Sequence, residues 1–233
     1  MINQILLGDC FDVLSNVESN SVDLILTDPP YDISRKSYFG SGSSTNKKFK
    51  DISIDFGYWD KDIDMDRLFS EFYRVLRKGG TVIVFYDIWK SNIIYDASKK
   101  NKFKQPRVCQ WIKNNAVPIN SKVNYLSNST EYFFSFVKGK LPTFNSEYDN
   151  ATYYFPLCHG RERLNHPTQK PLKLISELVK KHSNQGDLVL DPFSGTGTLA
   201  ESCILNGRNY LCIEMDEIYH RISIERINSI LGI

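Results

Sequence analysis

The stretch Val-Asp-Leu-Ile-Leu-Thr-Asp-Pro-Pro-Tyr, which ends at Tyr31, places an acid and an aromatic ring directly after an apolar segment. The apolar residues predict a buried strand over 22–27, and two prolines that cannot donate hydrogen bonds to a neighbouring strand end it. Asp28 and the carbonyl group of Pro29 then become acceptors beside the ring of Tyr31. Such a site suits the exocyclic amine of a nucleobase, although Asp-Pro-Pro-Tyr is also compatible with an ordinary turn.

A second motif, Asp-Pro-Phe-Ser-Gly-Thr-Gly-Thr, also follows an apolar segment and precedes a predicted helix. Gly195 and Gly197 permit close backbone approach, and Thr196 or Thr198 is expected to cap the helix. The glycine spacing differs from the dinucleotide fingerprint, and the motif lacks the Gly-Lys-Ser/Thr of a P-loop. A strand that ends about 20 residues later in Glu214 would bring an acid to ribose hydroxyls. The motif therefore predicts a nucleoside pocket without a pyrophosphate.

The composition favours one domain over residues 1–233, because a chain of 233 residues buries one sizeable core. No stretch reaches the roughly 18 apolar residues of a membrane span, and the N-terminus lacks a basic segment before an apolar run. We therefore expect a cytoplasmic protein. Five scattered cysteines without a Cys-x-x-Cys pair predict reduced core residues, and four histidines without ligand spacing indicate no metal site.

Alternating apolar strands and amphipathic helices predict an α/β fold with a mixed, mostly parallel sheet and helices on both faces. The predicted strands span 5–7, 22–27, 81–86, 108–113, 131–137, 187–191 and 210–214. The predicted helices span 11–17, 66–77, 89–99, 173–182, 198–206 and 218–231. Because ligands bind at the carboxyl ends of such strands, Asp9, Asp28, Asp191 and Glu214 should gather along one rim.

Two further segments bear on function. Residues 34–58 show no helical or strand period, which predicts a mobile loop, and residues 139–165 look irregular. Residues 99–140 carry nine Lys or Arg against a single acid, Glu131. That excess is compatible with a solvated basic face or with nucleic-acid contact.

The motifs together resemble those of the β-class S-adenosylmethionine-dependent amino DNA methyltransferases: Thr-Asp-Pro-Pro-Tyr, then His166-Pro-Thr-Gln-Lys-Pro, then Asp191-Pro-Phe-Ser-Gly-Thr-Gly-Thr. The resemblance extends from Gly8 to Glu214 and is weak over 32–60 and 115–165. It implies a Rossmann-like S-adenosylmethionine-dependent methyltransferase fold in circularly permuted order, with the catalytic half first and the cofactor half second.

The resemblance also implies roles for individual residues. The implied catalytic residues are Asp28, Pro29, Pro30 and Tyr31. The implied S-adenosylmethionine contacts are Asp9, Asp28, His166, Thr168, Lys170, Asp191, Phe193, Gly195, Gly197, Thr198 and Glu214. Lys170 would lie near the cofactor carboxylate, and Phe193 would pack on the cofactor. Taken singly, Lys170 also fits a cation that flanks a helix, and Phe193 fits a core aromatic.

The expected reaction is methyl transfer to the N6 amine of adenine in double-stranded DNA after the target base is flipped out of the duplex. The ring of Tyr31 would stack on that base. Carbon-5 methylation of cytosine is disfavoured because no cysteine stands at the catalytic motif. Cytosine N4 stays open as an alternative, as do RNA or protein amide substrates and a DNA-binding module without activity. Protein-glutamine methyltransferases usually carry Asn-Pro-Pro-Tyr, so Asp28 argues against that class.

Recognition of DNA is expected from the basic and aromatic span 99–165, together with the loop 34–58. A recognition region of this size favours a homodimer, in which a second copy completes the contact with the site. A cognate restriction endonuclease is a further expected partner.

Overall fold

The computed structural model describes residues 2–30, 63–116, 126–164, 166 and 168–233. The predicted loop 34–58 and the aromatic residue Tyr31 lie outside these residues. Within them, no helix combines the length and the apolar composition needed to cross a membrane. The five cysteines are all buried thiols, as expected of reduced core residues.

The described residues form an eight-stranded sheet in the order β1-β8-β7-β2-β3-β5-β4-β6. The strands are β1 (Gln4–Leu7), β2 (Val22–Thr27), β3 (Leu76–Phe85), β4 (Lys104–Lys113), β5 (Thr130–Val137), β6 (Thr152–Phe155), β7 (Leu188–Asp191) and β8 (Asn209–Glu214). β5 is antiparallel to both of its neighbours, β3 and β4, and the other neighbouring pairs are parallel. The predicted mixed, mostly parallel sheet is confirmed.

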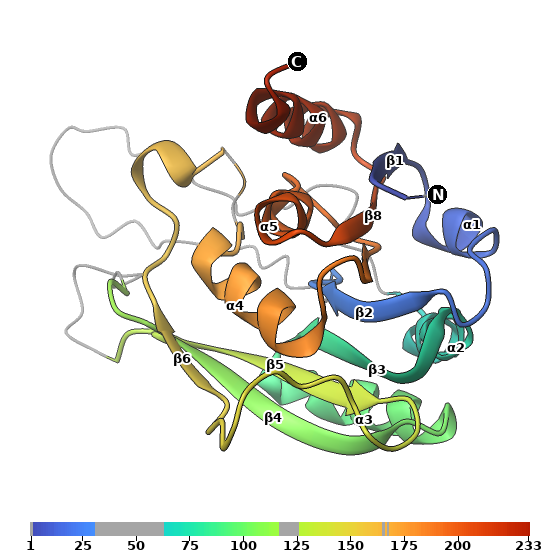
Figure 1. Cartoon of the computed structure of the whole chain (residues 1–233). Helices are drawn as coiled ribbons and strands as arrows, with labels where there is room; N and C mark the ends of the chain where they lie inside the picture. The colour runs from blue at the N-terminus through green and yellow to red at the C-terminus, as the bar shows by residue number, and fades with distance from the viewer. Residues whose placement is uncertain (1, 31–62, 117–125, 165, 167) are drawn as a thin grey trace, which may run out of the picture.

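Helices cover both faces of the sheet (Figure 1). They are α1 (Cys10–Leu14), α2 (Met65–Val75), α3 (Ser91–Lys100), α4 (Leu172–His182), α5 (Thr198–Asn206) and α6 (Glu217–Leu231), with short 3-10 turns at Ile88–Lys90 and Gly160–Glu162. Buried side chains of α1, α2 and α3 form one core, and those of α4, α5 and α6 form the other. β2 supplies both cores, because Ile25 faces the first while Leu24 and Leu26 face the second.

The chain order explains how the site is assembled. β7 and β8, which come late in the sequence, lie between β1 and β2, which come first. This arrangement agrees with the permuted order implied by the resemblance. Because β1, β8, β7 and β2 are parallel, their carboxyl ends meet at one edge of the sheet.

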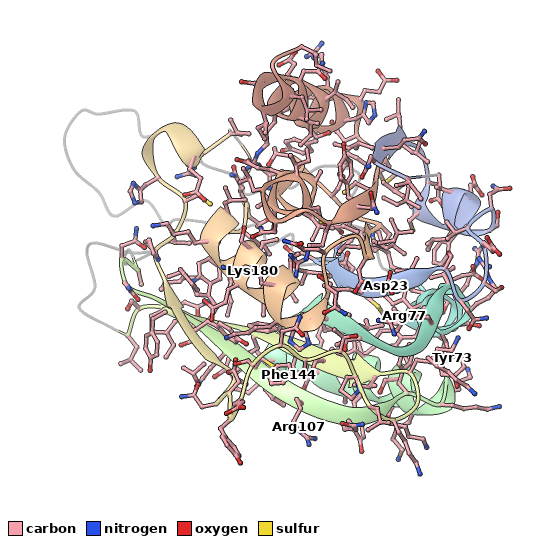
Figure 2. All side chains as sticks on the ribbon, in the orientation of Figure 1. Asp23, Tyr73, Arg77, Arg107, Phe144 and Lys180 are labelled. Carbon is pink, nitrogen blue, oxygen red and sulfur yellow. The ribbon has the colours of Figure 1, made fainter. Side chains whose placement is uncertain are left out.

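An ion-pair network joins the amino ends of the strands, on the side of the sheet opposite these carboxyl ends. Arg77 pairs with Asp23 at the amino end of β2, and its guanidinium also lies 4.0 Å from Asp187, just before β7 (Figure 2). Asp23 further accepts a hydrogen bond of 2.8 Å from the amide of Leu188. These contacts fix the relative position of two strands that carry acids at their other ends.

The boundary between α2 and β3 differs from the prediction. The helix expected over 66–77 ends at Val75, and β3 begins at Leu76, which pairs with Val22. The buried ammonium of Lys138 donates to the carbonyl groups of Tyr73 and Leu76 and so satisfies the end of α2.

The span 139–165, expected to be irregular, contains β6 at Thr152–Phe155. This strand is four residues long, and only Tyr153 within it is buried, so its hydrophobic pattern is too short to be recognised.

Candidate active site

A cavity of about 330 Å³ lies at the carboxyl edge of the sheet and is lined by residues from both predicted motifs. Following the strand order, Asp9 comes after β1, Glu214 ends β8, Asp191 ends β7 and Asp28 follows β2, and all four acids line this cavity. The prediction that these four acids gather along one rim is confirmed.

β2 ends where the two prolines begin. Thr27, its last residue, is buried, and its hydroxyl group donates a hydrogen bond of 2.7 Å to Asp191 Oδ1. This bond ties β2 to β7 in the wall of the cavity, because both residues line it. Asp28 and Pro30 line the cavity, whereas Pro29 is not among the lining residues.

Lys170 contributes a cation to the same rim. Its ammonium is buried, pairs with the carboxylate of Asp28, and lies 3.5 Å from Glu131 Oε2. The side chain lines the cavity, and its Nζ lies 5.0 Å from the ring centroid of Phe85. The resemblance placed this lysine beside the cofactor carboxylate. In the structure its carboxylate partners are two acids of the protein itself.

The second motif forms a turn that is organised by Glu214. One carboxylate oxygen of Glu214 accepts a 2.7 Å hydrogen bond from the amide of Gly195, and the other accepts a 2.8 Å bond from the amide of Asp216. Asp191 accepts a 3.1 Å bond from the amide of Phe193, whose ring lines the cavity. The motif therefore presents an acid and an aromatic residue from a turn whose amides are held by the carboxylates of Asp191 and Glu214.

Gly197 does not line the cavity directly. It is the N-cap residue of α5 with φ +77°, it is not among the cavity-lining residues, and an added Cβ would lie 2.9 Å from Ser223 Cβ on α6. It serves close helix packing. The expectation that Thr196 or Thr198 caps α5 is wrong, because the Thr198 hydroxyl instead accepts a hydrogen bond from Arg226.

Gly195 and His166 both line the cavity and lie close together. An added Cβ at Gly195 would lie 3.4 Å from His166 Nε2. The His166 imidazole packs against the ring of Tyr219 with centroids 4.5 Å apart, and its Nδ1 accepts a bond from the amide of Thr168. Burial, reinforced by the nearby Lys170 ammonium, lowers the pKa of His166 to about 4, so the ring is neutral at pH 7.

Burial also raises the pKa values of two of these four acids. It raises the pKa of Asp191 to about 7 against the opposing effect of its hydrogen bonds, and it raises the pKa of Glu214 above its ordinary value. Asp9, by contrast, uses Oδ1 to cap α1, accepting bonds from the amides of Phe11 and Asp12. The four acids therefore occupy different environments although they share one edge.

The basic region divides into parts with different surroundings. Lys138 is buried, and its ammonium donates to Asn20 and to backbone carbonyl groups. Lys104 pairs with Val137, at the edge opposite the cavity, and Arg107 stands on the outer side of the sheet (Figure 2). Lys113 lies at the cavity edge, in an ion pair with Glu131. Among the described residues of this stretch, the basic side chains therefore include a buried ammonium and cations near opposite ends of β4.

Sequence reasoning did not identify several side chains at this site. Thr27, Glu131 and Lys113 were not predicted as site residues, and neither was Tyr219, whose ring packs on His166. A signal existed for Glu131, because it is the lone acid in the basic stretch 99–140. Thr27 is the first residue of the Thr-Asp-Pro-Pro-Tyr motif, whereas no pattern marked Lys113 or Tyr219.

Comparison with known families gives a match over most of the chain. A family model described as DNA methylase matches residues 22–225. The type II methyltransferase M2.MboI of Moraxella bovis is 28% identical over 243 residues, which cover 96% of this chain and 86% of that protein. The type II methyltransferase M.HinfI of Haemophilus influenzae is 28% identical over 254 residues, with coverage of 98% and 69%.

Solved structures give a consistent result. The M1.HpyAVI–SAM complex superposes with a TM-score of 0.74 at 27% sequence identity and covers 97% of this chain and 98% of its own. The cytosine-N4-specific PvuII DNA methyltransferase superposes with a TM-score of 0.72 at 15% identity, covering 98% of this chain and 91% of its own. At that identity the second likeness concerns the fold alone.

Proposed function

Because the chain belongs to the N6/N4 DNA methylase family, we propose that it is a DNA methyltransferase that modifies the N6 amine of adenine with S-adenosylmethionine as methyl donor. The observation that carries this proposal is the meeting of Asp28, from the Asp-Pro-Pro-Tyr segment, with the turn from Asp191 to Thr198 in one cavity. The two motifs are more than 160 residues apart in the sequence. Their convergence joins an amine-binding segment to a nucleoside-binding turn.

The residues of the cavity fit S-adenosylmethionine. Glu214 is held by two backbone amides, and a carboxylate can accept further bonds from the two hydroxyls of a ribose. The ring of Phe193 offers an apolar face, and the amide-rich turn at Gly195 permits close approach. The M1.HpyAVI structure that superposes on this chain is a complex with SAM, which supports the same assignment.

When bound, S-adenosylmethionine supplies an electrophilic methyl group on its sulfonium. The carboxylate of Asp28 accepts a hydrogen bond from the target amine, which localises the nitrogen lone pair, and it receives the proton that the amine loses after transfer. Tyr31 stacks on the flipped base in this proposal. The ammonium of Lys170 stabilises the charge of Asp28 during these steps.

The choice of adenine over cytosine rests on Asp28. Cytosine-N4 enzymes resembling this family more often carry serine at the position of Asp28, so Asp28 favours adenine. Cytosine N4 is the second candidate, because cytosine also carries an exocyclic amine that suits the site. RNA, a protein amide and an inactive DNA-binding module are the remaining alternatives.

One incubation separates these substrates. The purified protein is mixed with methyl-labelled S-adenosylmethionine and unmethylated genomic DNA, and the nucleosides are then resolved by mass spectrometry. We expect label in N6-methyladenine. Label in N4-methylcytosine alone refutes the adenine assignment, and tight DNA binding without label favours the inactive module.

The proposed partners follow from the size of the recognition region and from the names of the similar proteins. We place DNA recognition on the parts of 99–165 that reach the cavity edge, together with 34–58, and we keep a homodimer and a cytoplasmic location as parts of the proposal. A cognate restriction endonuclease is included because the relatives are named type II methyltransferases. Sedimentation over a range of protein concentrations, with and without DNA, tests the dimer.

A further inference from the structure

Four charged side chains of alternating sign form a chain across the cavity edge of the sheet. In spatial order they are Lys113, Glu131, Lys170 and Asp28. They come from the end of β4, the beginning of β5, the segment before α4 and the position just after β2. Two cations and two anions leave the chain without net charge, so each inner member is balanced on both sides.

The two carboxylate oxygens of Glu131 lie near different cations. Its Oε1 lies 2.8 Å from Lys113 Nζ, and its Oε2 lies 3.5 Å from Lys170 Nζ. Burial alone would raise the pKa of Glu131, but the Lys170 and Lys113 ammonium groups outweigh this effect and hold the pKa below its ordinary value. Glu131 is therefore an anion at neutral pH and the only acid that touches both lysines among the described residues.

Lys170 needs such an anchor. A lysine side chain has four rotatable bonds, and a single partner leaves its ammonium several alternative positions. Here the Lys170 side chain is 8% exposed. Its ammonium lies near Asp28, Glu131, the Thr168 carbonyl group at 3.4 Å and the ring of Phe85. Removal of the Glu131 charge would leave two lysines repelling each other across the same position.

We propose that Glu131 is a positioning residue for methyl transfer, which holds the Lys170 ammonium beside Asp28 and so fixes the charge and orientation of that carboxylate. Glu131 itself touches neither substrate nor cofactor in this proposal. The inference rests on the proposed function, because it assigns Glu131 to the reaction that Asp28 performs.

The test uses Glu131→Gln, which keeps the shape of the side chain and removes its charge. We expect kcat to fall tenfold or more, while the dissociation constant for S-adenosylmethionine changes less than threefold. The double variant Glu131→Gln/Lys113→Met removes the competing cation as well. We expect it to recover at least threefold in kcat over the single variant, because Lys170 and Asp28 then balance each other. A purely structural role of Glu131 predicts no such rescue.

A matched control is available in the same molecule. Glu177 pairs with Lys181, which keeps Asp149 as a second partner, just as Lys170 keeps Asp28 in Glu131→Gln. Glu177→Gln should therefore leave kcat unchanged. Melting temperatures of all variants identify any that fail to fold.

A second readout does not depend on activity. Acylation of individual lysines by labelled acetic anhydride, followed by mass spectrometry, should show Lys170 at least threefold more reactive in Glu131→Gln than in the unmodified sequence. Glu177→Gln should leave the reactivity of Lys170 unchanged. Unchanged kcat and unchanged Lys170 reactivity in folded Glu131→Gln overturn the inference, and so does loss of kcat without rescue by the double variant. Absence of methyl transfer by the unmodified protein overturns the proposed function instead, and acylation still reports whether Glu131 positions Lys170.

Discussion

Replacement of Gly197 by alanine should destabilise the protein through two separable effects. The backbone at Gly197 has φ +77°, where an alanine costs about 1–2 kcal/mol. The new Cβ would also lie 2.9 Å from Ser223 Cβ, and forcing a methyl group into a packed interface costs about 1–3 kcal/mol more. Gly197→Ala should therefore lose about 2–5 kcal/mol of unfolding free energy.

Gly207→Ala provides the matched control at the other end of the same helix. Gly207 has φ +69°, and the nearest atom to an added Cβ is Gln185 Cγ at 3.8 Å, an ordinary contact. This variant should show the backbone cost alone. At about 2–4 °C per kcal/mol for a protein of this size, Gly197→Ala should melt roughly 2–12 °C below Gly207→Ala. Equal melting temperatures would show that α6 can shift away from the new methyl group without loss of stability, and would refute the packing argument.

The same variant distinguishes packing from ligand contact. Because Gly197 does not line the cavity, folded Gly197→Ala should bind S-adenosylmethionine within about threefold of the unmodified affinity, well under 1 kcal/mol. Gly195→Ala should weaken binding more, because its Cβ would enter the space beside His166. Isothermal titration at a temperature below both melting points measures the two affinities. A larger loss of affinity in Gly197→Ala than in Gly195→Ala would indicate that Gly197 contacts the cofactor.

Two further predictions concern the acids of the rim. Asp28→Ala should abolish methyl transfer while leaving S-adenosylmethionine affinity largely intact, as read by label incorporation and titration; a large loss of affinity would place Asp28 in the cofactor site. Because the folded-state pKa of Asp191 is about 7 against an ordinary 3.8, its contribution to stability is present below pH 4 and is lost as pH rises through 7, by up to about 4 kcal/mol. The difference in urea midpoint between the unmodified protein and Asp191→Asn should follow that slope, and a flat difference would contradict the buried state of Asp191.

The strands and the acids at their ends were predictable because both follow from local pattern. Apolar runs that stop at Thr27, Asp191 and Glu214 identify buried strands, and parallel pairing then requires their ends to meet. Neither step needs knowledge of distant contacts. For this reason the fold and the position of the cavity followed from the sequence.

The ion pairs of the rim were not predictable in the same way. Lys170 is separated by 142 positions from Asp28, and no local pattern selects its partner. The basic stretch illustrates the same limit, because a count of charges does not reveal that the ammonium of Lys138 is buried against the end of α2. Burial and pairing of long side chains are decided by tertiary packing.

The insertion of β7 and β8 between β1 and β2 also has a consequence for biosynthesis. When the first hundred residues have left the ribosome, β1 and β2 are present, but each lacks the strand that becomes its neighbour on the cofactor side. Those partners, Leu188–Asp191 and Asn209–Glu214, are translated more than 150 residues after β2. Pairings over such separations are slow to form, and open strand edges attract other chains meanwhile. The methyl-transfer centre is thus completed only after β8 has been translated, because a shorter chain lacks Glu214.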